Sequence, residues 1–276
     1  MKKDHAYILE HWKKRGDVSA LDARLEARGI PTDNPPIESL ASEDQLHVGG
    51  LDALRLFADW VGLEAGSKVL DLGAGLGGPA RWLASERGVE VTAVELSPEL
   101  SAAAVDLTGR CGLSDRITHV CADVVEFEES EQFDLVWLQH VDMHVAEKAA
   151  LYDTARNALT EGGRVVWHDW LAGPGGEPRW PLFWSADGSG SCVVSEERFR
   201  ETVGEAGLEL TRLEDVSEPA AQWLGRTRAA AERSLGKARS DASRARQNNL
   251  LEETRNALEC LAENRLVQFF AEARPR

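Results

Sequence analysis

Between residues 68 and 170, short apolar runs alternate with segments of helical periodicity. Short runs rich in apolar and β-branched residues predict strands, and longer segments with apolar residues three or four positions apart predict helices. This alternation is typical of βαβ units, so we expect a mostly parallel, doubly wound sheet. The predicted strands are 68–72, 90–95, 117–121, 133–139 and 164–170, and the predicted helices are 77–87, 98–112 and 146–159.

The segments on either side of this core have a different character. Residues 5–28 predict two short helices, 29–36 a turn-rich loop and 49–61 a helix before the first strand. Towards the end, 195–206 predicts a helix, 208–216 a strand, 218–263 a long polar helical stretch and 266–273 a closing strand antiparallel to 208–216. We therefore expect a Rossmann-like, seven-stranded α/β sheet with an antiparallel last strand and helices on both faces. The expected parts are an N-terminal helical lid (1–48), the core (49–217), a helical insert (218–264) and a closing strand (265–276).

Composition and charge exclude several classes of protein. The 276 residues include 43% hydrophobic ones, enough for a sizeable core, and no apolar run approaches the length that spans a bilayer. The N-terminus lacks the apolar region of a secretory signal, so we expect a cytoplasmic protein. A formal net charge of −16 argues against nucleic acid and anionic membranes as partners. The four cysteines form no CxxC pair, so we expect buried thiols and no zinc site.

A glycine-rich turn follows the first predicted strand. Asp71 near the strand's end precedes Gly73, Gly75 and Gly77, with Ala74 between the first two glycines. Glycines at such a turn let a cofactor approach the backbone at the start of a helix. The same pattern occurs in ordinary turns and in dinucleotide sites, so the glycine pattern by itself is weak evidence for a cofactor site.

Acidic residues at the ends of the next two strands sharpen the prediction. Glu95 ends the second strand about 20 residues after the turn, where a carboxylate that binds a ribose is expected. Asp123 follows the third strand, where it would accept a hydrogen bond from an adenine amino group. A nicotinamide-dependent oxidoreductase is the alternative, but its fingerprint spaces the glycines as GxGxxG. The turn here fits S-adenosylmethionine (product S-adenosylhomocysteine) better.

At these residues the chain resembles class I S-adenosylmethionine-dependent methyltransferases. Within them it is similar to bacterial small-molecule enzymes of the glycine, sarcosine and dimethylglycine type, through DQLHVGG at 44–50, VLDLGAGLGGPARWL at 69–83, WLQH at 137–140 and the aromatic WPLFW at 180–184. The resemblance implies a methyl donor held by residues around its methionine, ribose and adenine parts. These are Asp71, Gly73, Ala74, Gly75 and Gly77, then Glu95 and Leu96, then Asp123 and Val124, with Gln139 near the donor.

Methyl transfer requires an acceptor held in line with the donor and, for some acceptors, removal of a proton. His140, Met143 and His144 follow the fourth strand, and if this stretch is helical the two histidines share a face. Three interpretations stay open: a general base, a group that orients the substrate, or a structural role. A histidine pair without a third ligand does not predict a metal site.

Further candidates for acceptor contacts lie before the core and after the fifth strand. They are His47, His168, Trp180 and Trp184, and Asp169 is a candidate base or partner of a substrate ammonium. Aromatic faces bind cations or stack on flat rings; the alternative is a loop packed onto the core by its aromatics. We expect an enzyme that methylates N, O or C of a small molecule, either an amine or amino acid or a natural product. The helical insert would serve as a lid or as the arm of a homodimer.

Overall fold

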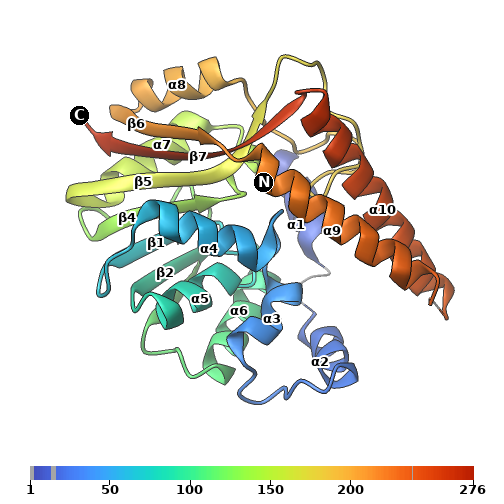
Figure 1. Ribbon diagram of the computed structural model, residues 1–276. Helices are drawn as coiled ribbons and strands as arrows, with labels where there is room; N and C mark the ends of the chain where they lie inside the picture. Colours follow the sequence, from blue (N-terminus) through green and yellow to red (C-terminus); the bar gives the residue numbers. More distant parts are fainter. Residues whose placement is uncertain (1–2, 14–16, 238) are drawn as a thin grey trace.

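The protein folds around one seven-stranded sheet, shown in Figure 1 from a computed structural model that describes residues 3–13, 17–237 and 239–276. The order of the strands is β3-β2-β1-β4-β5-β7-β6, and only β7 runs antiparallel to its neighbours. The predicted Rossmann-like sheet, including the antiparallel pairing of the two last strands, is confirmed. The strands are β1 (Lys68–Leu72), β2 (Glu90–Glu95), β3 (Ile117–Cys121), β4 (Phe133–Gln139), β5 (Leu159–Ala172), β6 (Leu208–Asp215) and β7 (Leu266–Pro275).

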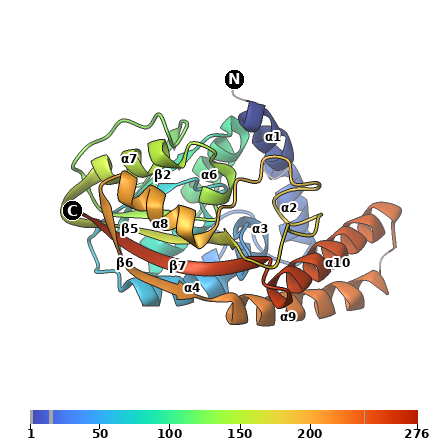
Figure 2. The ribbon, with the colours of Figure 1, turned by 90° about the horizontal axis from the view of Figure 1, so that it is seen from above.

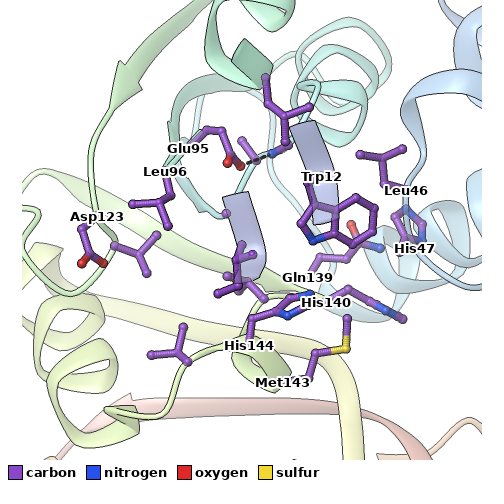
Figure 3. A pocket seen from close by; sticks show the side chains of 18 of the residues that line it. Trp12, Leu46, His47, Glu95, Leu96, Asp123, Gln139, His140, Met143 and His144 are labelled. Carbon is purple, nitrogen blue, oxygen red and sulfur yellow. Dashed lines mark hydrogen bonds between the residues drawn. The ribbon is translucent and has the colours of Figure 1, made fainter. Parts of the chain in front are cut away.

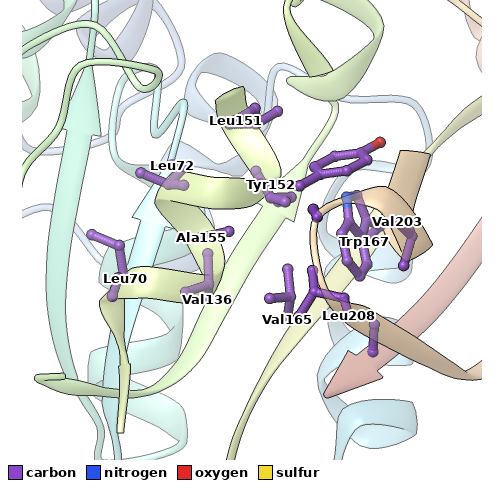
Figure 4. Close-up of a cluster of buried hydrophobic side chains, with 14 of the residues drawn as sticks. Leu70, Leu72, Val136, Leu151, Tyr152, Ala155, Val165, Trp167, Val203 and Leu208 are labelled. Carbon is purple, nitrogen blue, oxygen red and sulfur yellow. The ribbon is translucent and has the colours of Figure 1, made fainter. Parts of the chain in front are cut away.

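Helices cover both faces of the sheet and create two apolar layers. On one face α4 (Gly50–Val61) and α5 (Gly78–Glu86) bury a cluster around Phe57 and Trp137. On the other face α7 (Lys148–Ala158) and α8 (Glu196–Glu205) bury a second cluster, where Tyr152 of α7 lies beside Trp167 of β5 (Figure 4). Because both faces are covered, the central strands are mostly apolar, as the continuous runs predicted. The helix α6 (Pro98–Arg110) packs against β2 and β3.

Three helices precede the core. They are α1 (Lys3–Trp12), α2 (Val18–Ala27) and α3 (Ile37–Asp44). The helix α3 was not predicted, because eight residues are too few to establish helical periodicity. Residues 1–2 and 14–16 of the predicted N-terminal region lie outside the described residues.

The long polar stretch near the C-terminus forms a hairpin of two helices and not one continuous helix. The helix α9 (Ser217–Leu235) is followed by Gly236, and α10 (Asp241–Ala262) begins after Ser240, whose hydroxyl accepts from the Ser243 N–H. Figures 1 and 2 show both helices extending well beyond the sheet. The base of the hairpin packs on the loop after β5 through Leu224 and Cys260.

The strand β5 begins at Leu159, five residues earlier than predicted. Its pairing with β4 shifts between Phe133 and Leu135, so the glycines at 162–163 sit in an irregular part of the strand. Glycine weakens the apolar signal there, which explains the late predicted start. No helix in the described part of the chain is long and apolar enough to cross a membrane.

Candidate active site

The glycine turn after β1 has a backbone that only glycine adopts easily. Gly73, Gly75 and Gly77 all have positive φ, at 83°, 57° and 72°. A Cβ on Gly73 would lie 2.4 Å from Val141 Cγ2, so the turn also packs directly against the segment after β4. The N–H groups of Gly73 and Ala74 both donate to the Val94 carbonyl at 2.9 Å. The turn is therefore fixed against β2, with the N-terminus of α5 next to it.

Glu95 joins the end of β2 to this turn. Its Oε2 accepts from the Gly75 N–H and its Oε1 from the Ser97 N–H, each at 2.8 Å. Burial raises the pKa of Glu95, and these N–H groups oppose the rise because they favour the ionised form. Figure 3 shows Glu95 and Leu96 projecting at the edge of the cavity. A carboxylate ordered in this way retains lone pairs for further hydroxyl donors.

One cavity brings most of the predicted site together. It holds about 1100 Å³ of empty space, its open mouth included, and runs from the glycine turn to the segment after β4 (Figure 3). The predicted residues that line it are Gly73, Ala74, Gly75, Glu95, Leu96, Asp123, Val124, Gln139, His140, Met143, His144 and His47.

Two of the predicted cofactor residues lie behind the cavity wall. Asp71 is buried under the turn, where burial and the nearby Glu95 raise its pKa to about 7. A Cβ on Gly77 would approach Arg81 Nη1 at 3.0 Å, so Gly77 faces the start of α5. Neither is among the residues that line the cavity. The structure therefore gives Asp71 and Gly77 a place in shaping the turn, and their contact with the methyl donor stays a prediction.

The sequence did not indicate several residues of the cavity wall. Ile8 and Trp12 come from α1, at the N-terminal end of the chain, and Figure 3 shows Trp12 at the cavity. Asp44 and Leu46 come from α3 and the segment after it. Nothing in the pattern of α1 indicates where that helix packs, since docking on the cavity is a tertiary contact. By contrast, α9 and α10 contribute no described residue to the wall.

His144 lies at the end of the cavity away from Glu95 (Figure 3). Only Asp142–His144 is helical, as one short 3-10 turn, and His140 has φ 54°, so the two histidines do not share a helix face. Burial lowers the pKa of His144 to about 4, and the imidazole is neutral near pH 7. The ring of Trp12 meets it edge-on at 6.1 Å. A neutral imidazole has one unprotonated ring nitrogen that can accept a proton, and burial makes that nitrogen a weaker base than in a free histidine.

A buried ionic cluster holds the 3-10 turn in place. Asp169 Oδ2 accepts from the Asp142 N–H at 2.9 Å, and its Oδ1 accepts from the Trp170 N–H at 2.8 Å. Lys148 Nζ donates to Asp142 Oδ2 at 2.8 Å. Burial and the neighbouring Asp142 raise the pKa of Asp169 to about 7. Asp169 thus anchors the segment before His144, and the expectation that it meets the substrate is corrected.

Three histidine rings gather at one side of the cavity, and two of them, His47 and His140, line it. His140 lies 4.7 Å from His168 and 5.6 Å from His47, measured between ring centroids. Burial lowers the pKa of His47 to about 4 and that of His168 to about 3. His168 is fully buried, is absent from the cavity wall and bonds to Gln139, which corrects the expected substrate contact. Within the described ranges, no group of three such ligands is arranged to hold a metal ion.

The tryptophans after β5 pack into the protein. Trp184 stacks on Trp170 at 5.6 Å and donates to Ser191 Oγ, and Trp180 meets Trp184 edge-on at 6.1 Å. Neither lines the cavity. The alternative of a loop held on the core by its aromatics is what the structure shows, and the substrate contacts expected for Trp180 and Trp184 are corrected.

Comparison with known proteins agrees with this geometry. Residues 70–167 match the family described as a methyltransferase domain. Phosphoethanolamine N-methyltransferase 1 of Triticum aestivum is 30% identical, over 50% of this chain and 28% of that protein. The 27-O-demethylrifamycin SV methyltransferase of Amycolatopsis mediterranei is 32% identical, over 56% of this chain and 59% of that protein. The chain thus spans less than two thirds of the length of either relative.

Among solved structures, Haemonchus contortus phosphoethanolamine N-methyltransferase 2, in complex with phosphomonomethylethanolamine and S-adenosylhomocysteine, has the same fold. The TM-score is 0.74 at 22% identity, over 87% of this chain and 57% of that chain. Residues 70–167 therefore carry a methyltransferase domain, and the chain shares the fold of an enzyme solved with S-adenosylhomocysteine. The match disfavours the oxidoreductase that the glycine turn alone left open.

Proposed function

We propose that the protein transfers a methyl group from S-adenosylmethionine to N, O or C of a small-molecule acceptor. The observation that carries the proposal is that one cavity joins the Glu95-braced glycine turn to a neutral histidine at its other end. The donor would supply an electrophilic methyl group that needs no further activation. The protein then has to position the acceptor, exclude water and accept a proton.

The wall near Glu95 suits the nucleoside part of the donor. Glu95 offers carboxylate oxygens to the ribose hydroxyls, and Asp123 with Val124 stands at the end of the neighbouring strand for the adenine. Such ligands bind beyond the carboxyl ends of the strands in open α/β sheets. Because Gly73 and Gly75 lack side chains, the methionine part can lie against the turn.

His144 is the proposed general base. Its ring lines the cavity, it is neutral near pH 7, and the cluster of Asp142, Lys148 and Asp169 holds its backbone. An acceptor amine or hydroxyl placed beside it would lose its proton to the imidazole as the methyl group arrives. Trp12, which also lines the cavity, meets the ring edge-on.

The charges of the wall favour a particular kind of acceptor. Among the described lining residues there is no lysine or arginine, whereas Asp44, Glu95, Asp123 and Glu147 are acidic. Phosphate groups are usually bound by arginine, lysine or clusters of backbone N–H groups. We therefore infer a neutral or amine-bearing acceptor, such as an amine metabolite or a natural product, and not a phosphomonoester.

Two measurements test this function. Calorimetric titration should show binding of S-adenosylhomocysteine and none of nicotinamide dinucleotides; binding of the nicotinamide ligand alone would overturn the class of reaction. Mass spectrometry of a panel of amines, phenols, amino acids and phosphorylated amines should then show a gain of one methylene group. A gain confined to the phosphorylated amines would refute the inferred acceptor class, because the described lining residues include no lysine or arginine to bind them.

A further inference from the structure

Three neighbouring strands carry a row of polar side chains on the face that α4 covers. In the register of the sheet, Gln139 of β4 lies opposite His168 of β5, and Gln268 of β7 lies opposite Trp170, two residues from His168. Since side chains two residues apart share a face, Trp137, Gln139, His168 and Gln268 all point to the same side. Gln139 of this row also lines the cavity.

At the Trp137 end of the row, the chemistry of the side chains decides which atom donates each hydrogen bond and which atom accepts it. Trp137 Nε1 lies 3.1 Å from Gln139 Oε1, and an indole nitrogen can only donate. The amide nitrogen of Gln139 must therefore face His168 Nδ1, 2.9 Å away, and donate to it. His168 is neutral, because burial lowers its pKa to about 3. With Nδ1 as an acceptor, the single ring proton of His168 is on Nε2.

The direction continues to His140. His168 Nε2 is buried and has no hydrogen bond of ordinary length to a described residue. Gln268 directs its amide nitrogen, and not its amide oxygen, to His140, where Gln268 Nε2 lies 3.2 Å from His140 Nε2. An amide nitrogen donates, so His140 Nε2 accepts.

The backbone fixes the orientation of His140. Its N–H donates to the His168 carbonyl at 2.9 Å, its φ is positive, and its Nε2 faces Gln268 of β7. The ring lines the cavity, and its Nδ1 has no hydrogen bond to any residue that the structure describes. Nδ1 is the only ring nitrogen left for a molecule in the cavity.

We propose that the row from Trp137 through Gln139, His168 and Gln268 sets the tautomer of His140, which presents Nδ1–H to the cavity as a hydrogen-bond donor. His140 is then a group that orients the acceptor through one of the acceptor's oxygen atoms, and proton removal is left to His144. Gln268 is a positioning residue, and it lies outside the 70–167 match. Only the role towards the acceptor rests on the proposed function, since the tautomer follows from the hydrogen bonds.

Nuclear magnetic resonance of the full chain labelled with ¹⁵N-histidine tests the tautomer directly. Long-range ¹H–¹⁵N spectra near neutral pH distinguish protonated from unprotonated ring nitrogens, and His140→Gln assigns the signals. We expect the parent protein to show a protonated Nδ1 and an unprotonated Nε2 at His140, with and without S-adenosylhomocysteine. A protonated Nε2 would overturn the proposal, and this measurement needs no turnover.

Variants of the row add a second readout. In Gln268→Glu the carboxylate accepts, so His140 Nε2 should become protonated. In Trp137→Phe the donor that orients Gln139 is lost, and the His140 signals should move towards a mixture of tautomers. Gln132→Glu makes the same chemical change at an exposed position and should leave His140 unchanged. Unchanged nitrogen types in Gln268→Glu and Trp137→Phe would refute the row as the cause. Failure to bind S-adenosylhomocysteine would count against the proposed function only.

Discussion

The Arg81 guanidinium donates to Asp44 Oδ2 across 2.8 Å, and neither side chain is exposed by more than 2%. The pair joins α5, which follows the glycine turn, to the end of α3. The two segments are so close that a Cβ on Gly78 would lie 2.5 Å from the Asp44 carbonyl oxygen. Since Asp44 also lines the cavity, this contact places the N-terminal region against the glycine turn.

Removal of one partner should be costly. In Arg81→Met the Asp44 carboxylate is left buried without its cation, and we expect a loss of about 3–5 kcal/mol in the free energy of unfolding. Urea unfolding measures it. Arg226→Met is the matched control, because its ion pair with Asp52 is largely exposed and should contribute less than about 1 kcal/mol. Equal losses in the two variants would contradict the buried pair's role.

Glu95→Ala should weaken binding of S-adenosylhomocysteine. The variant loses the expected hydrogen bonds to the ribose and also the brace on the Gly75 and Ser97 N–H groups. We expect a cost of about 1–3 kcal/mol, or roughly 5- to 150-fold in Kd by calorimetry. Glu90→Ala, an exposed residue at the other end of β2, serves as control. Unchanged affinity in Glu95→Ala would remove Glu95 from the site.

His144→Ala should separate chemistry from donor binding. We expect turnover to fall by about 100-fold or more, the usual contribution of a general base, while the affinity for S-adenosylhomocysteine is retained. Because the pKa of His144 is about 4, turnover of the parent protein should stay constant on acidification to about pH 5 and fall only towards pH 4. Full activity in His144→Ala would end the general-base role.

His168 should make stability depend on pH in a specific direction. Its folded pKa of about 3 is below the unfolded value of 6.5, so its contribution is fully present above pH 6.5 and is lost as pH falls towards 3. Between about pH 7.5 and about pH 5 this loss amounts to about 2 kcal/mol. The glutamine in His168→Gln cannot be protonated. Over this pH range the free energy of unfolding should therefore fall by about 2 kcal/mol more in the parent protein than in the variant.

The comparison of the two proteins is needed because other groups oppose this trend. Asp71 and Asp169 have folded pKa values of about 7, above the unfolded value, so their contribution is present at low pH and lost as pH rises through 7. Both occur in parent and variant, and their effect cancels in the difference. An equal pH dependence of the two proteins would show that His168 is not buried as a neutral ring.

The sequence by itself determined the core of the sheet and the cofactor half of the site. Strands that are covered on both faces appear in the sequence as nearly continuous apolar runs. The turn after the first strand needs glycine at the positions where φ is positive. Both features can therefore be recognised in the local sequence. Glu95 and Asp123 follow strand ends, which meet at one edge of a parallel sheet. The sequence could therefore predict that Glu95 and Asp123 lie near each other without any knowledge of side-chain packing.

Only the tertiary structure decided the acceptor half. Trp12 reaches the cavity through the docking of α1, whereas Trp184, equally aromatic in sequence, stacks on Trp170 inside the protein. His140 and His168 differ for the same reason: one follows β4 with a positive φ, and the other lies within β5 under α4. Contacts between segments that are distant in the sequence determine where these side chains lie, and such contacts cannot be predicted from the local pattern of residues.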